Sequence, residues 1–158
     1  DLLKAGSEKI SINTSSVQNP ALIRTASETF GSQSIVVSID IKKNWRGKYI
    51  VVSHGSKKKT NLDPVEWAKK VEELGAGEIL LNCVYRDGTM SGYDLEFVES
   101  IASQVDIPLI ACGGAGKYHD IQMLFTNTKV SAAAAGSLFV FHGKHKAVLI
   151  NYPSYEKT

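Results

Sequence analysis

The sequence predicts an α/β protein whose parallel strands are joined by helical crossovers. Two observations lead to this prediction. Apolar runs of strand length alternate along the chain with amphipathic runs of helical period. The short runs are apolar at successive positions, which is typical of strands buried on both faces of a parallel sheet. We expect five main strands. A closed barrel of this type needs about eight strands and an open sheet needs no closure, so the runs alone leave both architectures open.

The amino-terminal half contains the first two expected strands. The spacing of Leu22, Ile23 and Phe30 is helical, and the continuous β-branched run after Gly31 is typical of a buried strand. In chain order we expect the last turn of a helix at 2–5, a strand at 9–14, a helix up to Gly31, a strand at 34–40, and a hairpin within 41–61 that has 48–53 as one arm.

The second half has clearer helix signals. Asp63 is suited to the N-cap, Pro64 to the first helical position and Gly75 to the terminator. Asp94 is expected to cap the next helix. The remaining expected elements are strands at 78–84, 108–114 and 131–137, and helices at 94–104, at 117–125 and after Gly136 and Ser137.

Composition narrows the class of protein. The 158 residues suffice for one domain, and a net charge of +2 is too small to indicate a nucleic-acid or membrane partner. Cys83 and Cys112 lie 29 positions apart without CxxC spacing, and we expect them to be reduced thiols. Neither a signal peptide nor a membrane-length apolar run is visible, so we expect a cytoplasmic protein.

Polar or very small residues follow every expected strand. Ligands of parallel α/β folds bind beyond the carboxyl ends of the strands, so these residues form the candidate site. Each type is also an ordinary turn former, but together they favour a site. The candidate residues are Asn13, Thr14, Asp40, Asn82, Asp87, Gly88, Gly113, Gly114, Gly136 and Ser137.

The glycine-rich stretch 112–117 (CGGAGK) predicts an anion site. It leaves a strand and enters a helix, so we expect its backbone N–H groups and the positive helix end to face one ligand, usually a phosphate. Gly136 and Ser137 repeat this arrangement one unit later. A dinucleotide fingerprint and a P-loop are absent, so we interpret the ligand as a sugar phosphate and expect no metal or cofactor.

Three charged residues need an explanation. Asp40 ends a β-branched strand, where it is either a turn cap or an acid/base group in a partly desolvated mouth. Lys9 and Glu78 lie at the amino ends of two strands, where charges facing a barrel interior would be costly unless they were paired.

Four longer stretches closely resemble the cyclase subunit of imidazole glycerol phosphate synthase: 9–23, 30–40, 75–94 and 107–117. The resemblance covers nearly the whole chain to about Phe141. It implies a (β/α)₈ TIM barrel that uses ammonia from a glutaminase partner to split a phosphoribulosyl-formimino imidazole ribonucleotide. The products are imidazole glycerol phosphate and an aminoimidazole carboxamide ribotide, in histidine biosynthesis.

The resemblance also implies a role for each matching residue. Asp40 resembles one of two catalytic aspartates and acts as general acid/base, and Asn82 stands where the family often has Thr near the substrate. Lys9 and Glu78 resemble half of a charged gate for ammonia, and Glu8 falls at the glutaminase interface. One phosphate site would use Asn13 and Thr14; the other phosphate and glycerol site would use Asp87, Gly88, Gly113, Gly114, Gly136 and Ser137.

The chain also departs from this family. The first three βα units are missing, so residues 1–158 would be the carboxyl-terminal part of one barrel, strands four to eight, with the phosphate-binding half at 78–140. We expect the chain alone to lack cyclase activity and, with two open sheet edges, to be prone to self-association. Its carboxyl-terminal end resembles cyclase relatives that take part in amidation of a surface-polysaccharide sugar.

Other functions stay open at this point. A non-catalytic, phosphate-binding half-barrel is favoured by the missing second aspartate. The sugar-phosphate isomerase of the same pathway shares the barrel and paired aspartates, but 11–15 (SINTS) and 86–94 (RDGTMSGYD) fit the cyclase better. A nucleic-acid-binding module is least favoured.

Overall fold

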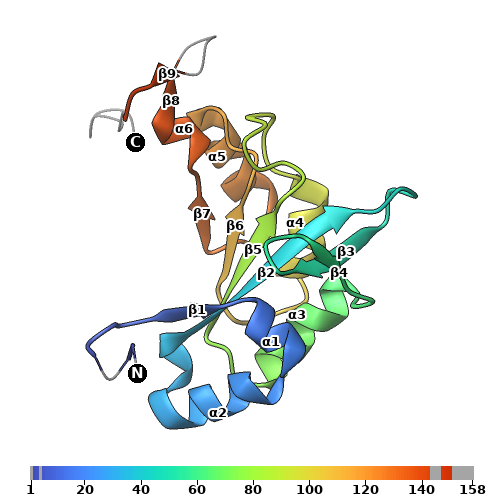
Figure 1. Ribbon diagram of the computed structural model, residues 1–158. Coiled ribbons are helices and arrows are strands. Elements are labelled where there is room, and N and C mark those ends of the chain that lie inside the picture. Colours follow the sequence, from blue (N-terminus) through green and yellow to red (C-terminus); the bar gives the residue numbers. More distant parts are fainter. Residues whose placement is uncertain (1, 4, 143–146, 151–158) are drawn as a thin grey trace.

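Seven strands of the computed structural model, β1 to β7, form one twisted sheet, and β8 and β9 form a separate two-stranded sheet (Figure 1). The structure describes residues 2, 3, 5–142 and 147–150. The strands are β1 (Ile10–Ile12), β2 (Ile35–Lys43), β3 (Tyr49–Ser53), β4 (Lys58–Lys59), β5 (Glu78–Cys83), β6 (Leu109–Cys112), β7 (Ala132–Ala134), β8 (Phe141–His142) and β9 (Ala147–Val148). The helices are α1 (Thr14–Gln18), α2 (Ala21–Phe30), the 3₁₀ turn η1 (Ser32–Ser34), α3 (Pro64–Glu73), α4 (Leu95–Ala102), α5 (Tyr118–Asn127) and α6 (Ser137–Val140).

The five expected parallel strands are confirmed. They pair in the order β1-β2-β5-β6-β7, each through a parallel ladder. β2 is the longest strand because two partners share one of its edges. β1 pairs with Ile35–Val37, and the antiparallel β3 pairs with Asp40–Lys43. The expected hairpin is also confirmed, with β3 as its first arm and the short β4 as its second.

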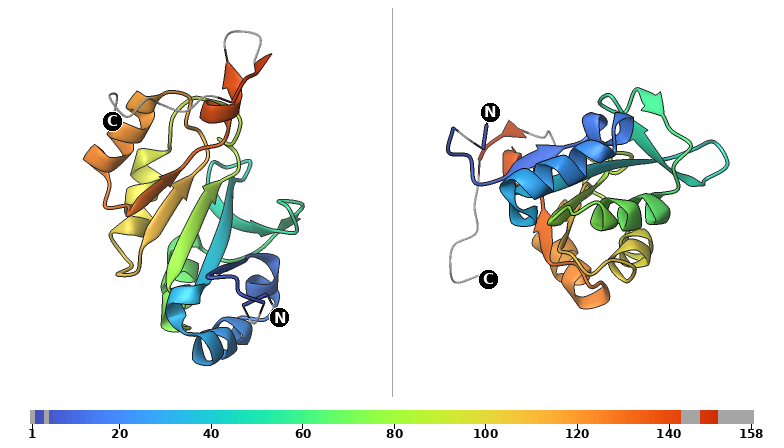
Figure 2. Two further views of the ribbon diagram at one scale, coloured as in Figure 1. Left: turned by 90° about the vertical axis from the view of Figure 1, so that its left-hand side faces the viewer. Right: turned by 90° about the horizontal axis from the view of Figure 1, so that it is seen from below.

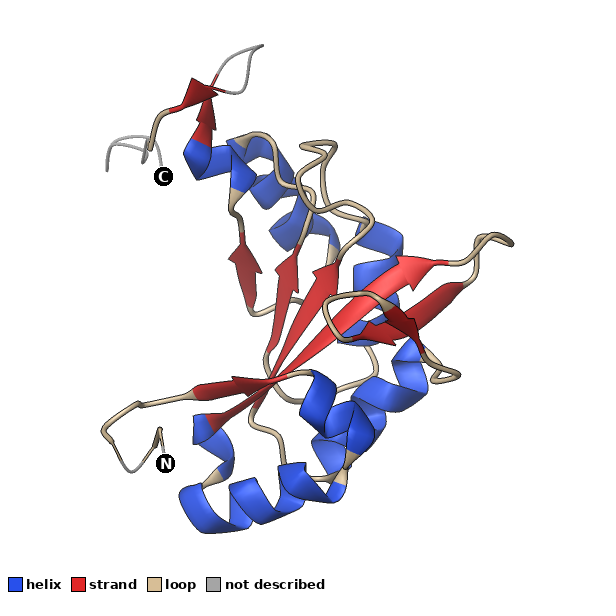
Figure 3. Ribbon diagram, in the orientation of Figure 1, coloured by secondary structure: helices blue, strands red, loops and turns tan. Residues whose placement is uncertain are grey.

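The two faces of the sheet differ in burial. In β2 and β5, Ile39, Ile79 and Leu81 are fully buried, whereas the alternate residues Ser38 and Leu80 are only partly buried. α4 and α5 lie behind the strands in Figure 1 and to one side of them in Figure 2, and α3 packs against β2 and β5. The helices therefore cover the apolar face, and the carboxyl ends of the parallel strands meet at one edge (Figure 3).

Several predicted boundaries are wrong. The end of a helix was expected at 2–5, but the described residues of this range form hydrogen-bonded turns and no helix. Ala5 N–H donates to the Leu2 carbonyl in one of these turns. The strand expected at 9–14 ends at Ile12, because α1 begins at Thr14. The strand expected at 131–137 is likewise confined to β7.

The two expected aspartate caps differ. Asp63 caps α3 as predicted, since its Oδ1 accepts hydrogen bonds from the N–H groups of Val65 (3.0 Å) and Glu66 (3.3 Å). Asp94 stands at the N-cap of α4, but its side chain accepts no bond from the helix backbone. The carboxylate binds two tyrosine hydroxyls instead.

Candidate functional site

Asp40 and Asn82 lie opposite each other near the carboxyl end of the parallel ladder between β2 and β5. The strand expected at 34–40 continues past Asp40 to Lys43, because residues 40–43 also pair with β3. Asn82 Nδ2 donates to Asp40 Oδ1 at 3.1 Å, which orients the carboxylate. Asp40 is 9% exposed. Asn82 Oδ1 is buried and, among the described residues, accepts no hydrogen bond. A buried carbonyl oxygen without a partner is costly, so this corner is suited to a ligand that brings an N–H or O–H group.

Asn13 and Thr14 lie directly after β1, beside the β3–β4 hairpin. Asn13 Nδ2 donates to Ser38 Oγ at 3.4 Å. Thr14 Oγ1 accepts the backbone N–H of His54 at 2.8 Å, so the Thr14 hydroxyl also fixes the end of β3. The sequence did not single out His54 for this place. The feature that marks His54 is its positive φ of 55°, which is unusual for a residue other than glycine and is visible only in the structure.

The other candidate residues gather around one small hollow at the ends of β5, β6 and β7. The loop after β5 contributes Asp87 and Gly88, and the turn after β6 contributes Gly113 and Gly114. The rest of the lining consists of Cys112, Ala115, Ala134, Ala135, Gly136 and Ser137. The structure thus brings together predicted site residues from three loops that are far apart in the sequence. Most of the lining residues are Gly, Ala or Ser, and their small size leaves the hollow open.

The structure gives a second reason why glycine is required at 113 and 114, which the sequence alone did not reveal. Gly113 and Gly114 have φ values of +97° and +114°, a region that disfavours side chains. A Cβ on Gly114 would lie 2.2 Å from the Gly92 carbonyl oxygen, and one on Gly113 would lie 2.6 Å from that of Cys83. The backbone that approaches these two glycines closely is therefore the end of β5 and the loop that follows it.

One feature of the predicted anion site is wrong. The N–H groups of Gly116 and Lys117, at the start of α5, donate to Asp120 Oδ2 at 2.9 and 3.1 Å. The carboxylate of the helix's own first turn thus occupies the position where the sequence predicted an external anion. Donors for a phosphate must come from the remaining groups around the hollow.

Lys9 and Glu78 lie at the opposite edge of the sheet from Asp40. The Lys9 ammonium donates to Glu78 Oε1, so these two charges form an ion pair. The pair joins the residue before β1 to the first residue of β5, and Lys9 is about half exposed.

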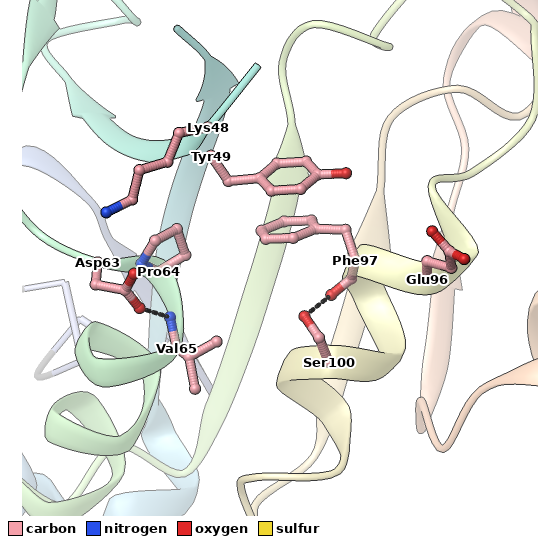
Figure 4. Close-up of a pocket in the computed structure, with 8 residues that line it drawn as sticks. All are labelled: Lys48, Tyr49, Asp63, Pro64, Val65, Glu96, Phe97 and Ser100. Carbon is pink, nitrogen blue, oxygen red and sulfur yellow. Dashed lines mark hydrogen bonds between the residues drawn. The ribbon is translucent and has the colours of Figure 1, made fainter. Parts of the chain in front are cut away.

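A second cavity lies on the helical side of the sheet (Figure 4). Its wall includes the ring of Tyr49, which is stacked on Phe97 with centroids 3.9 Å apart. Two of its polar side chains bind the backbone nearby, since Asp63 caps α3 and Ser100 Oγ donates to the Phe97 carbonyl. The lining residues are Lys48, Tyr49, Asp63, Pro64, Val65, Glu96, Phe97 and Ser100. Its residues supply packing and capping to the fold.

Both thiols are predicted to be unreactive in the folded protein. Burial raises the pKa of Cys83 to about 12. Burial, with the nearby Asp87 charge, also raises the pKa of Cys112. At pH 8 we expect a thiol reagent to modify Cys83 roughly a thousandfold more slowly than in urea-unfolded protein, because the reactive thiolate is depleted. Peptide mapping of the alkylated protein measures this, and rapid modification of native Cys83 would contradict it.

The described residues contain no group of three His, Cys, Asp or Glu side chains that could hold a metal ion. Every described helix is too short or too polar to cross a lipid bilayer.

The fold places this chain among the parallel α/β proteins, whose ligands generally bind beyond the carboxyl ends of the strands. Its candidate residues lie at that end of the sheet. The family model described as histidine biosynthesis protein matches residues 1–146. The chain therefore belongs to the histidine biosynthesis protein family, and the resemblance seen in the sequence is confirmed.

Curated relatives agree with this assignment. The chain is 51% identical over 156 residues to a Pseudomonas aeruginosa protein provisionally named imidazole glycerol phosphate synthase subunit hisF2, covering 99% of this chain and 62% of the relative. It is 46% identical over 141 residues to subunit HisF of Alkaliphilus metalliredigens, covering 89% and 56%. It is 47% identical over 154 residues to a Vibrio vulnificus protein provisionally named subunit hisF3, covering 97% and 59%. The chain thus spans between 56% and 62% of the length of these relatives.

Proposed function

We propose that this chain supplies strands four to eight of a (β/α)₈ barrel that acts as an ammonia-dependent cyclase. The reaction would convert the phosphoribulosyl-formimino imidazole ribonucleotide to imidazole glycerol phosphate and the aminoimidazole carboxamide ribotide. The observation that favours this function most is the place of Asp40. It is a nearly buried carboxylate towards the carboxyl end of β2, held by Asn82, in the mouth where the reacting part of a substrate would lie.

In this proposal Asp40 is the general acid/base. A carboxylate fixed by one hydrogen bond needs little reorganisation to accept or return a proton during ring closure. Asn82 Oδ1, which has no hydrogen-bond partner within the described part of the chain, would accept a hydrogen bond from the substrate. The hollow with Asp87, Gly88, Gly113, Gly114, Gly136 and Ser137 would bind the glycerol-phosphate end, with Asn13 and Thr14 at the other phosphate.

Ammonia would enter from the opposite edge. Lys9 and Glu78 form an ion pair at the amino ends of β1 and β5, where the resemblance places a charged gate. Glu8 is beside this pair, and the glutaminase subunit would dock there. The barrel interior would then conduct ammonia from the Lys9–Glu78 end to Asp40.

The proposal is tested by restoring a whole barrel. We would fuse the first three βα units of the hisF2 relative to this chain and supply the ribonucleotide with ammonium salt. Turnover, followed as loss of substrate absorbance, is the expected result for the fusion, and none is expected for the chain alone. A fusion that folds and binds phosphate but leaves the ribonucleotide unchanged would overturn the proposal.

One observation favours a second candidate, ammonia-dependent amidation of a surface-polysaccharide sugar. The alignments with the relatives named hisF2 and hisF3 cover 99% and 97% of this chain. The alignments with the HisF subunits of Alkaliphilus metalliredigens and Clostridium botulinum each cover 89% of it. The carboxyl-terminal end, which resembles the surface-sugar relatives in sequence, is thus shared with the former group. Failure of the ribonucleotide assay by a folded fusion favours this candidate.

A further inference from the structure

A buried carboxylate that the proposed reaction does not use lies on the helical side of the sheet. The Asp94 side chain is 9% exposed. Its Oδ2 accepts the hydroxyl hydrogens of Tyr49 at 2.9 Å and Tyr85 at 2.5 Å. The same oxygen lies 3.5 Å from Lys43 Nζ and 3.8 Å from Arg86 Nε. One oxygen therefore attracts two phenols and two cations.

Three segments of the chain meet at Asp94. Lys43 and Tyr49 come from the two sides of the β2–β3 turn, and Tyr85 and Arg86 come from the loop after β5. Asp94 itself starts α4. The Tyr49 ring stacks on a phenylalanine of α4, and in Figure 4 its hydroxyl points away from the cavity that the ring helps to line. The Lys43 ammonium lies 4.7 Å from the centre of the Tyr49 ring and 5.2 Å from that of Tyr85.

The surroundings hold this carboxylate in its charged form. Burial by itself would raise the pKa of Asp94, but the hydroxyls of Tyr85 and Tyr49 and the charges of Lys43 and Arg86 outweigh it and lower that pKa. An ionised Asp94 keeps the buried Arg86 Nε, which has no hydrogen-bond partner among the described residues, beside a compensating charge.

Arg86 connects this cluster to the hollow. Its Nη1 donates to the Gly92 carbonyl at 3.1 Å and lies 3.5 Å from the Ser91 carbonyl, which closes the loop from 86 to 92. The Gly92 N–H in turn donates to the Gly114 carbonyl at 2.8 Å. Asp87 and Gly88 lie within this closed loop and line the hollow.

We propose that Asp94 is a positioning residue: its carboxylate fixes Arg86, and through Arg86 it holds the loop 86–92 and its Asp87 and Gly88 against the glycine turn after β6. The expected effect of Asp94 on phosphate affinity rests on the proposed function of the hollow as a phosphate site. The expected effect on the order of the loop 86–92 does not rest on it, and the two effects can be measured separately.

The test compares Asp94→Asn with Glu96→Gln in the full chain. The Asp94 side chain makes no cap bond to the backbone of α4, so a substitution of nearly the same shape leaves the helix start as it is. The amide of Asn removes the charge that faces Arg86. Glu96 is exposed in the same first turn of α4 and is a matched control for loss of a negative charge at a helix start. The readouts are hydrogen exchange of the amides of 86–92 and the affinity for inorganic phosphate.

We expect Asp94→Asn to accelerate exchange in 86–92 by about tenfold and to weaken phosphate binding by a similar factor, a coupling in the usual range. Glu96→Gln should leave both unchanged. A merely structural Asp94 would lower the unfolding midpoint but leave loop exchange and the phosphate affinity of the folded protein as they were, and that result would overturn the proposal. If wild-type protein binds no phosphate, the phosphate site fails, and loop exchange still decides the role of Asp94.

A milder variant covers the case in which Asp94→Asn does not fold. Tyr85→Phe removes one hydroxyl donor from Asp94 and keeps both charges. A smaller acceleration confined to the amides of 86–92 supports the proposal. Exchange in 86–92 that matches wild type contradicts it.

Discussion

Asp40→Asn is expected to lower the turnover of the restored barrel by about a thousandfold, the usual contribution of a general acid/base. The substitution removes the titrating group but keeps an oxygen that can accept the Asn82 amide hydrogen. Its shape is nearly unchanged, so we expect fold and phosphate affinity to persist. The measurement is kcat with saturating ribonucleotide and ammonium salt.

Asp106→Asn provides the control for this prediction. Asp106 lies in the loop before β6 and is exposed, so its neutralisation should leave kcat within experimental error. A folded Asp40→Asn fusion with wild-type turnover would remove Asp40 from the reaction. It would also favour the interpretation of this chain as a non-catalytic phosphate-binding half-barrel.

Gly114→Ala is expected to destabilise the chain by roughly 3 kcal/mol. Two costs add: the left-handed backbone disfavours a side chain by about 1–2 kcal/mol, and forced overpacking adds about 1–3 kcal/mol. The overpacking is against backbone, since the new Cβ would lie 2.2 Å from the Gly92 carbonyl oxygen. The loop after β5 would have to move away, so phosphate affinity should fall together with stability. Urea unfolding at 25 °C measures the first effect.

Two other glycines at the hollow separate these costs. Gly136 has no positive φ and open space where a Cβ would be placed, so Gly136→Ala should be nearly neutral for stability. Gly88 has a φ of +73° and open space, so Gly88→Ala should cost only the backbone term, about 1 kcal/mol. Equal losses for all three variants would show that the contact with Gly92 is unimportant.

Local sequence patterns were sufficient for the elements whose signals are local. The apolar runs of β2, β5 and β6 and the cap of α3 depend on residues adjacent in the chain, and all four were predicted. Because parallel strands place their carboxyl ends at one edge, the grouping of Asp40 with Asn82 also followed from the order of elements. α1 escaped prediction because a five-residue helix has too few positions to show a period.

The sequence by itself determined the alternation of strands and helices, the parallel sheet and the positions of the candidate site residues after the strands. It could do so because periodicity and helix caps depend on short stretches of the chain. Only the tertiary structure decided how those positions are occupied. Asp120 takes the N–H groups expected to bind an anion, Gly92 makes the close approach that Gly114 allows, and Asp94 turns from its helix to two tyrosines. The contacts of Gly92 with Gly114 and of Asp94 with Tyr49 join residues far apart in the chain. The contact of Asp120 with Gly116 depends on the angle at which the glycine turn enters α5. Their energies arise from burial and charge in three dimensions.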